Sequence, residues 1–308
     1  MKGPGRILIL GLPYFGNMLA SQLSERGWHA RYRTHPGHDP RGWASLLPEL
    51  ARADVVYLIG SRLDRRSPQD RLMRLRRRPV VIHWVGTDVL IAREEHQRKN
   101  VSAPIAEGAI HWCDAPWLVD ELREMGMHGA YVPLPVPLPR VEPSALPERF
   151  RVLLYLPVDA FDREVFDMDT LLRLPHELPE VDFILLPSPA ETLPGPLPAN
   201  VEARAWVEDM EALYEEITVY VRLTSHDGMS FMALESLARG RYVIWTHPLD
   251  GAIQASGFEG VARELGALHE RHRRGDLPLN TSGRETTLEH FVEQQALDDI
   301  DARLRALL

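Results

Sequence analysis

Short runs rich in β-branched residues alternate with helical patterns along almost the whole chain, and this alternation narrows the possible folds most. It is typical of βαβ units, in which parallel strands form one sheet and helices cover its faces. In the first half we expect strands at residues 6–10, 28–33, 54–59, 79–84, 109–112 and 130–132, with helices at 17–26, 67–76 and 116–125 among those between them. Six such strands predict a complete doubly wound α/β domain.

A proline-rich segment separates this half from a second alternation. Prolines stand at 133, 135, 137, 139, 143 and 147, where their rings block both helix and central strand, so we expect residues 136–150 to form an extended linker. Beyond it we expect strands at 152–156, 182–186, 201–205, 219–223 and 242–246 and helices at 208–217 and 229–239. Residues 285–308 have apolar side chains at helical spacing and are predicted to form one helix that packs onto the body. The predicted domains are 1–135, joined by 285–308, and 151–284.

The composition disfavours several classes of protein. A chain of 308 residues, 44% of them hydrophobic, is long enough for two cores of ordinary size. No apolar run is long enough to cross a membrane and no signal peptide opens the chain, so we expect a soluble, cytoplasmic protein. The formal charge of −9 argues against a general nucleic-acid binder.

Cysteine and histidine give no metal motif. The single cysteine, Cys113, cannot form an internal disulfide, and His269 and His272 lack the companion ligands of a zinc site. We therefore predict no metal site. Arginines at 71, 74 and 76–78 are expected to be the solvated end of a helix, with contact to an anionic membrane or a lipid-linked acceptor as the open alternative.

The strongest chemical signal lies in residues 221–244, which read as strand, polar turn, helix, glycine and strand. We predict that Asp227 lies at the helix start, where the amide groups of residues 228–230 and the helix dipole favour an anion such as a diphosphate. Asp227 and Glu235 are two turns apart on a similar face and would accept hydrogen bonds from sugar and ribose hydroxyls. An Asp helix cap with a solvated glutamate is the competing interpretation.

This segment resembles the Glu-x(7)-Glu signature of retaining glycosyltransferases of family 4, with Asp227 at the first acid and Glu235 at the second. The small residue, glycine and strand of 238–244 match the pattern that follows in that family. The resemblance implies a GT-B fold, in which two Rossmann-like domains face each other and the second one holds the nucleotide sugar. The donor-binding residues that it implies are Gly228, Met229, Ser230, Glu235, Arg222 and Ser225.

A second motif, at residues 79–89, is similar to the His-Gly-x-Asp turn of the same family's first domain. Val85 stands where the family has histidine, but His83 lies two residues earlier on the same strand face. His83 is therefore a candidate catalytic residue that would reach the cleft, with a buried structural histidine as the alternative. Gly86 and Asp88 are expected to form the turn and helix cap that shape the cleft wall.

Two further loops follow predicted strands. The loop that contains Gly11 and Gly16 opens a helix but is not Gly-x-Gly-x-x-Gly, and the second strand does not end in an acid, which argues against a nicotinamide site. The resemblance places this loop on the acceptor side. The loop at 156–163 lacks the lysine that the family places on the donor diphosphate, so Arg163 or Arg222 would supply that charge.

The resemblance implies a hexosyltransferase that moves a sugar from a nucleotide diphosphate sugar to an acceptor hydroxyl, with retention of configuration and without metal or cofactor. The candidate catalytic residues are Asp227, Arg163 and His83. Two alternatives stay open: a catalytically silent homologue that binds a nucleotide sugar or glycan, and a sugar-nucleotide epimerase. The donor base, the sugar, the acceptor and the oligomeric state do not follow from the sequence.

Overall fold

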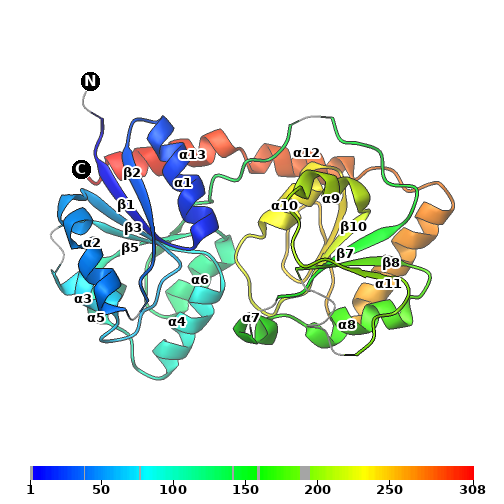
Figure 1. Ribbon diagram of the computed structural model, residues 1–308, viewed down its shortest axis with the longest axis horizontal. Coiled ribbons are helices and arrows are strands. Elements are labelled where there is room, and N and C mark those ends of the chain that lie inside the picture. Colours follow the sequence, from blue (N-terminus) through cyan, green and yellow to red (C-terminus); the bar gives the residue numbers. More distant parts are fainter. Residues whose placement is uncertain (1–2, 38, 76–77, 141, 158–159, 188–194) are drawn as a thin grey trace. The chain divides into compact units, whose positions relative to one another are not determined.

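The computed structural model describes residues 3–37, 39–75, 78–140, 142–157, 160–187 and 195–308 (Figure 1). Contacts between residues divide the chain into two compact units. Unit 1 consists of Met1–Val136, Asp227–Met229 and Val292–Leu308, and unit 2 of Pro137–His226 and Ser230–Phe291. After Val136 the chain thus enters unit 2. It contributes three residues to unit 1 at Asp227–Met229, and all described residues from Val292 on belong to unit 1 again.

Unit 1 is built on a six-stranded parallel sheet of order β2-β1-β3-β4-β5-β6, with helices on its faces (Figure 1). The strands are β1 (Arg6–Gly11), β2 (His29–Thr34), β3 (Val55–Ile59), β4 (Val80–Trp84), β5 (Ile110–Cys113) and β6 (Gly129–Tyr131). The helices are α1 (Pro13–Glu25), α2 (Pro40–Arg52), α3 (Pro68–Leu75), α4 (Thr87–Gln97), α5 (Ala103–Gly108), α6 (Pro116–Glu124) and α13 (Glu293–Arg305). The strand order reverses between β1 and β3, which is the doubly wound arrangement.

The core of unit 1 explains why the C-terminal segment belongs to it. Every residue of β3 and β4 is buried, as expected for central strands of a sheet that helices cover on both faces. Leu19 of α1 and Tyr57 of β3 share one hydrophobic cluster with Leu297, Ile300 and Leu304 of α13. Burial of each such aliphatic side chain stabilises the fold by about 1.5–3 kcal/mol, so α13 is an integral part of unit 1.

Unit 2 repeats the architecture with a parallel sheet of order β12-β11-β10-β7-β8-β9. The strands are β7 (Arg151–Tyr155), β8 (Asp182–Leu186), β9 (Val201–Ala203), β10 (Val219–Arg222), β11 (Tyr242–Trp245) and β12 (Ile253–Gln254). The helices are α7 (Ala160–Val165), α8 (Met168–Glu177), α9 (Met210–Glu216), α10 (Phe231–Ala238), α11 (Gly257–Arg273) and α12 (Thr281–His290). Here the order reverses between β7 and β10.

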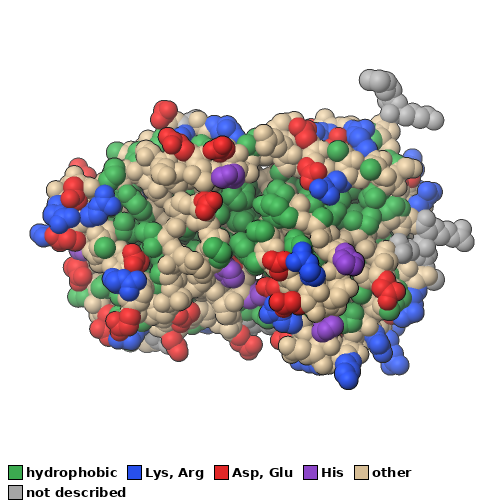
Figure 2. Space-filling view, turned by 180° about the vertical axis from the view of Figure 1, so that it is seen from behind, with side chains coloured by type: hydrophobic (Ala, Val, Ile, Leu, Met, Phe, Trp, Pro, Cys, Tyr) green, Lys and Arg blue, Asp and Glu red, His purple; other side chains and the backbone are tan. Residues whose placement is uncertain are grey.

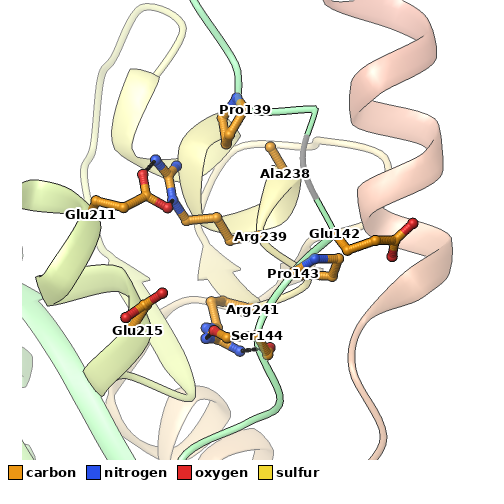
Figure 3. A pocket seen from close by; sticks show the side chains of 9 residues that line it. All are labelled: Pro139, Glu142, Pro143, Ser144, Glu211, Glu215, Ala238, Arg239 and Arg241. Atoms are coloured by element: carbon orange, nitrogen blue, oxygen red, sulfur yellow. Dashed lines mark hydrogen bonds and ion pairs between the residues drawn. The ribbon is translucent and has the colours of Figure 1, made fainter.

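The segment between β6 and β7 has neither helix nor strand among its described residues, 132–140 and 142–150. One buried arginine fixes part of it to the body of unit 2. Arg241, 1% exposed, donates through Nε to the carbonyl oxygen of Tyr214 at 2.8 Å and through Nη1 to that of Ser144 at 3.1 Å. Nη2 donates to the Ser144 hydroxyl at 2.7 Å. Figure 3 shows Arg241 and Ser144 lining a pocket beside α9 and α10, where Arg239 pairs with Glu211.

The expected α/β class and both parallel sheets are confirmed, and each of the expected strands lies within two residues of an observed one. The predicted helix at 17–26 begins earlier, at Pro13, because proline suits the first helical position. The single helix predicted for 285–308 is wrong. The structure has α12 and α13 there, and Phe291 caps α12 by donating its amide to the carbonyl oxygen of Thr287.

Candidate functional site

The carboxyl ends of β7, β10 and β11 lie at one edge of the unit 2 sheet, where ligands of such sheets bind. Hydrogen bonds join the loops that follow these strands. The amide of Ser225 donates to the carbonyl oxygen of Val165 at 2.8 Å, and so does its hydroxyl at 3.0 Å. The hydroxyl of Thr246 donates to the carbonyl oxygen of Thr224 at 2.7 Å and accepts from the Thr224 amide at 3.1 Å. The structure therefore brings the predicted residue Ser225 to the segment that carries Arg163.

Arg222 ends β10 at this edge and is partly buried. Its guanidinium lies 5.1 Å from the ring centroid of Phe166 and 5.8 Å from that of Tyr155, and Nη1 donates to the Tyr220 hydroxyl at 3.4 Å. Stacking on aromatic faces holds the plane of a guanidinium in a fixed orientation. Arg163 lies on α7 and is also partly buried.

Helix α10 begins later than the sequence predicts. Ser230 is its N-cap, and the Ser230 hydroxyl accepts the amide of Ala233 at 3.3 Å. The predicted placement of Asp227 at the helix start is therefore wrong, because the serine three residues later takes the cap position.

Glu235 lies in the middle of α10 and is only partly exposed. The Tyr214 hydroxyl of α9 donates to its Oε2 at 2.5 Å. Burial raises the pKa of Glu235, while this hydrogen bond and the charge of Arg239 oppose the rise. The interpretation of Glu235 as a solvated surface residue does not hold, since its carboxylate is engaged within unit 2 and keeps one further oxygen as an acceptor.

The three residues before Ser230 pack within unit 1. The indole Nε1 of Trp117 donates to the carbonyl oxygen of Asp227 at 2.7 Å, and the amide of Met229 donates to the carboxylate of Asp114. A Cβ at Gly228 would lie 2.2 Å from the carbonyl oxygen of Val85. Glycine is therefore required at 228 by close backbone packing, whether or not a ligand also approaches it.

Asp88, Asp114 and Asp227 form a group of buried carboxyls in unit 1. Burial raises the pKa of Asp88 to about 7, against four backbone hydrogen bonds that favour its charged form. Burial and the negative charges of Asp88 and Asp227 raise the pKa of Asp114 well above its usual range, and Asp114 Oδ1 has no hydrogen-bond partner. Asp114 was not among the predicted site residues, although its position directly after a buried strand is the pattern that would have indicated it.

The turn that holds Asp88 differs from the predicted cap. Gly86, at φ 129°, is the N-cap residue of α4, and Asp88 lies one residue inside the helix. The Asp88 carboxylate accepts the amide of Val85 at 3.1 Å and the amide of Val89 at 3.0 Å, so it still closes the turn. A Cβ at Gly86 would lie 2.5 Å from the amide nitrogen of Gly228, which again requires glycine.

His83 does not reach a ligand-binding surface, which corrects its prediction as a catalytic residue. Its side chain is fully buried, Nδ1 is 2.6 Å from the Tyr57 hydroxyl, and Nε2 is 2.9 Å from the carbonyl oxygen of Val132. Burial lowers the pKa of His83 to about 3, so the ring is neutral. Both nitrogens are engaged in the core, and the alternative of a buried structural histidine holds.

Gly11, the last residue of β1, and Gly16, in the first turn of α1, have packing roles. A Cβ at Gly11, which has φ 134°, would lie 1.9 Å from the carbonyl oxygen of Ile59. A Cβ at Gly16 would lie 2.3 Å from the ring of Tyr32, whose hydroxyl donates to the Gly11 carbonyl oxygen at 2.9 Å. Both glycines are thus required by close packing, and Tyr14 of α1 is 59% exposed.

Within the described ranges, no three or more His, Cys, Asp or Glu side chains are arranged to hold a metal ion. In the same part of the chain, no helix has the length and apolar character needed to cross a bilayer. Cys113 is buried, and burial raises the pKa of its thiol.

Comparisons with known proteins identify the fold and no closer relationship. No protein-family model matches the chain, and no curated protein matches it in sequence. Among solved structures, sucrose-phosphate synthase from Thermosynechococcus elongatus has a TM-score of 0.71 at 14% identity, over 98% of this chain and 99% of that chain. The glycotransferase of kitacinnamycin has a TM-score of 0.55 at 14% identity, over 98% of this chain and 99% of that chain.

A third similar structure is the pneumococcal O-GlcNAc transferase GtfA in complex with UDP and GlcNAc, with a TM-score of 0.57 at 10% identity. It aligns with 86% of this chain, which spans 60% of that chain. At these identities the likeness concerns the fold alone. The expected GT-B architecture of two Rossmann-like units is confirmed, while membership of family 4 stays a prediction.

Proposed function

We propose that this chain is a glycosyltransferase that moves a sugar from a nucleotide diphosphate sugar to an acceptor hydroxyl. The observation that carries the proposal is the β10–α10 connection of unit 2, in which Arg222 at the strand end and a serine-capped helix start lie at the ligand-binding edge of the sheet. The glycosyltransferase structures with the same fold support it, and GtfA was solved with UDP bound.

The donor diphosphate is proposed to bind at Arg222 and the start of α10. The guanidinium of Arg222 is held over Phe166, and the helix dipole at the start of α10 favours an anion. Arg163, on the neighbouring α7, is the second candidate cation. The free oxygen of Glu235 is proposed to accept a ribose hydroxyl, in keeping with the family 4 resemblance.

The residues before α10 complete the proposed donor set. Asp227 is proposed to accept hydrogen bonds from the sugar hydroxyls, with Gly228 and Ser230 providing backbone contacts, whereas the Met229 amide donates to Asp114. The acceptor is proposed to meet the unit 1 loops that carry Gly11, Gly16, Gly86 and Asp88.

The chemistry proposed is the one that family 4 implies, with retention of configuration and no metal. Negative charge builds on the departing diphosphate in the transition state, and fixed donors that match this charge lower the barrier. Arg222 and the start of α10 would provide them without reorganisation. Loss of one such donor typically costs two to three orders of magnitude in rate.

The test is a thermal-shift and mass-spectrometric screen against UDP-, GDP-, ADP- and TDP-sugars that follows both stabilisation and release of the nucleotide diphosphate. Arg222→Ala should abolish most of the response. Arg173→Ala is the matched control, because Arg173 also stacks on a phenylalanine, 3.7 Å from the Phe258 centroid, but lies on α8. No stabilisation by any donor, or equal losses in the two variants, would refute the proposal.

One observation favours the silent nucleotide-sugar binder as the second candidate. The chain has only two lysines, Lys2 and Lys99, and both lie in unit 1, so unit 2 has none for a donor phosphate. Stabilisation by a donor without release of the nucleotide, in the presence of a broad panel of acceptors, would favour this candidate. Product analysis in the same screen would also detect an epimerised sugar nucleotide.

A further inference from the structure

Two loops of unit 1 enclose a shallow pocket of about 520 Å³ that is lined by Arg65, His96, Gln97, Lys99 and Val101. One loop follows β3 and the other connects α4 to α5. They pair in antiparallel fashion, with an isolated bridge between Asp64 and Val101 and a hydrogen bond of 2.9 Å from the Arg65 amide to the Asn100 carbonyl oxygen. The backbones of the two loops that line the pocket are therefore held together.

The pocket has cationic side chains from both loops. The guanidinium of Arg65 is oriented by a hydrogen bond of 3.0 Å from Nε to the carbonyl oxygen of Val101. Among the described residues, neither Arg65 nor Lys99 has a carboxylate within ion-pair distance. Figure 2 shows Lys and Arg side chains along its lower right margin, the side on which α3 to α5 lie.

The acidic groups next to the pocket already have partners. Asp64 pairs with Arg62 at 2.8 Å, and Arg98 pairs with Glu94 at 3.2 Å and with Glu95 at 3.0 Å. Because Glu94 and Glu95 share Arg98, the four cations Arg62, Arg65, Arg98 and Lys99 face three carboxylates, which leaves a net charge of +1 at the pocket. An anion that enters would thus find net positive charge within a concave surface.

The backbone supplies a second, independent observation. Arg66 and Lys99 are the non-glycine residues with positive φ in the described part of the chain, at 67° and 54°. Lys99 directly follows the C-cap residue of α4 and donates its amide to the His96 carbonyl oxygen, a position that glycine usually occupies. A side chain with a Cβ is disfavoured in this conformation. The chain nevertheless places a basic residue there in each of the two paired loops.

We infer that this pocket binds a phosphate-bearing group. The planar donors of Arg65 suit phosphate oxygens, and the Lys99 ammonium adds a point charge from the opposite loop. A phosphorylated soluble molecule and a phospholipid headgroup share this chemistry. The inference goes beyond the proposed function, since the pocket contains none of the residues assigned to the nucleotide sugar.

The decisive variant is Lys99→Gly. It removes the ammonium and at the same time places glycine at a left-handed position, so the melting temperature should stay the same or rise. Affinity for inorganic phosphate, measured by calorimetric titration of the full chain, should nevertheless fall roughly tenfold, as expected for the loss of one charge-assisted contact. Arg65→Gln should have a similar effect on affinity.

The matched control is Arg98→Gln. Arg98 is adjacent in sequence and equally cationic, but it is engaged by two glutamates and does not line the pocket. It should leave phosphate affinity within about twofold of the wild type, because screening weakens exposed charges that make no contact. If Arg98→Gln and Lys99→Gly weaken binding equally, the attraction is diffuse and the site is refuted.

Vesicles identify the source of the phosphate group. Phosphate binding without co-sedimentation on vesicles of phosphatidylcholine and phosphatidylglycerol supports a soluble ligand. Co-sedimentation that Lys99→Gly abolishes, and that pure phosphatidylcholine does not give, supports a lipid headgroup. Binding of the wild type to neither probe overturns the inference. The thermal stabilisation of the same variants by nucleotide sugars is measured in parallel. A failure of the phosphate pocket is thereby distinguished from a failure of the proposed function.

Discussion

The contacts of Arg241 allow us to work out how much free energy of unfolding is lost when its buried guanidinium is removed. We consider Arg241→Met, which keeps most of the apolar stem and removes the guanidinium (Figure 3). The acceptors of its hydrogen bonds differ in exposure. Ser144 and Ala145 are exposed and can turn to water, whereas Tyr214 is 1% exposed and its carbonyl oxygen would lose its bond to Arg241 Nε inside the unit.

The expected loss follows from these contacts. An unsatisfied buried carbonyl costs about 1–3 kcal/mol, and hydrogen bonds from a charged donor are worth about 1.5–3 kcal/mol each before water replaces them. Burial lowers the pKa of Arg241, which shows that the guanidinium itself is held at a desolvation cost that the variant recovers in part. We expect a net destabilisation of about 2–3 kcal/mol at the linker.

The assay is hydrogen–deuterium exchange of the full chain, read by mass spectrometry on peptides of the linker and of α9. A loss of 2–3 kcal/mol corresponds to a decrease in protection of roughly 30- to 140-fold. Arg149→Met is the control, because the Arg149 side chain is 68% exposed and its ion pair with Asp182 should contribute about 0–1 kcal/mol. The reasoning is refuted if protection in the two variants falls equally, or if the linker peptides do not change.

Three further predictions concern the candidate site. Glu235→Ala should weaken nucleotide-sugar binding about tenfold in a calorimetric titration without unfolding unit 2. Tyr214→Phe, which removes only the hydroxyl that donates to Glu235, is the control. Unchanged affinity in Glu235→Ala would count against the donor assignment. The pKa of Asp88 is raised from 3.8 to about 7, so its contribution to stability is present below about pH 4 and is lost as the pH rises through 7. Between about pH 5 and about pH 8, urea titrations should therefore show a larger loss of stability for the wild type than for the non-titrating Asp88→Asn, and parallel curves would disprove the assignment. Gly228→Ala should destabilise unit 1 by about 1–3 kcal/mol, because the new methyl meets a backbone carbonyl at 2.2 Å, whereas Gly266→Ala meets nothing within 4 Å and should be neutral or stabilising in the same thermal melts.

The sheets could be predicted because their strands are short apolar runs bounded by polar turns. Strands β3 and β4 are buried along their whole length, and such strands read as continuous apolar segments in the sequence. The first residue of a helix was harder to predict where two residues that favour the N-cap position lie close together. Asp227 and Ser230 are both good caps, and nothing local decides that α10 starts after the second one.

The candidate site was only partly predictable, because its contacts depend on which strands are neighbours. The parallel pairing of β4 with β5 places Trp84 beside Cys113, and this brings the turn of Asp88 close to Asp114. Sequence spacing alone does not reveal that pairing. For His83, the two-residue period of a strand predicts which side chains share a face, but in a sheet covered on both sides each face is interior, and His83 is buried.

The route of the chain between the two units has a consequence for how the protein is made. Unit 2 occupies one stretch, 137–291, apart from three residues, and all of its strands have been synthesised before residue 255. Unit 1 begins first but lacks Leu297, Ile300 and Leu304 of its core until α13 has been synthesised, after the whole of unit 2. On a ribosome the inserted unit can therefore complete its core while the unit that precedes it in sequence still has an open apolar face.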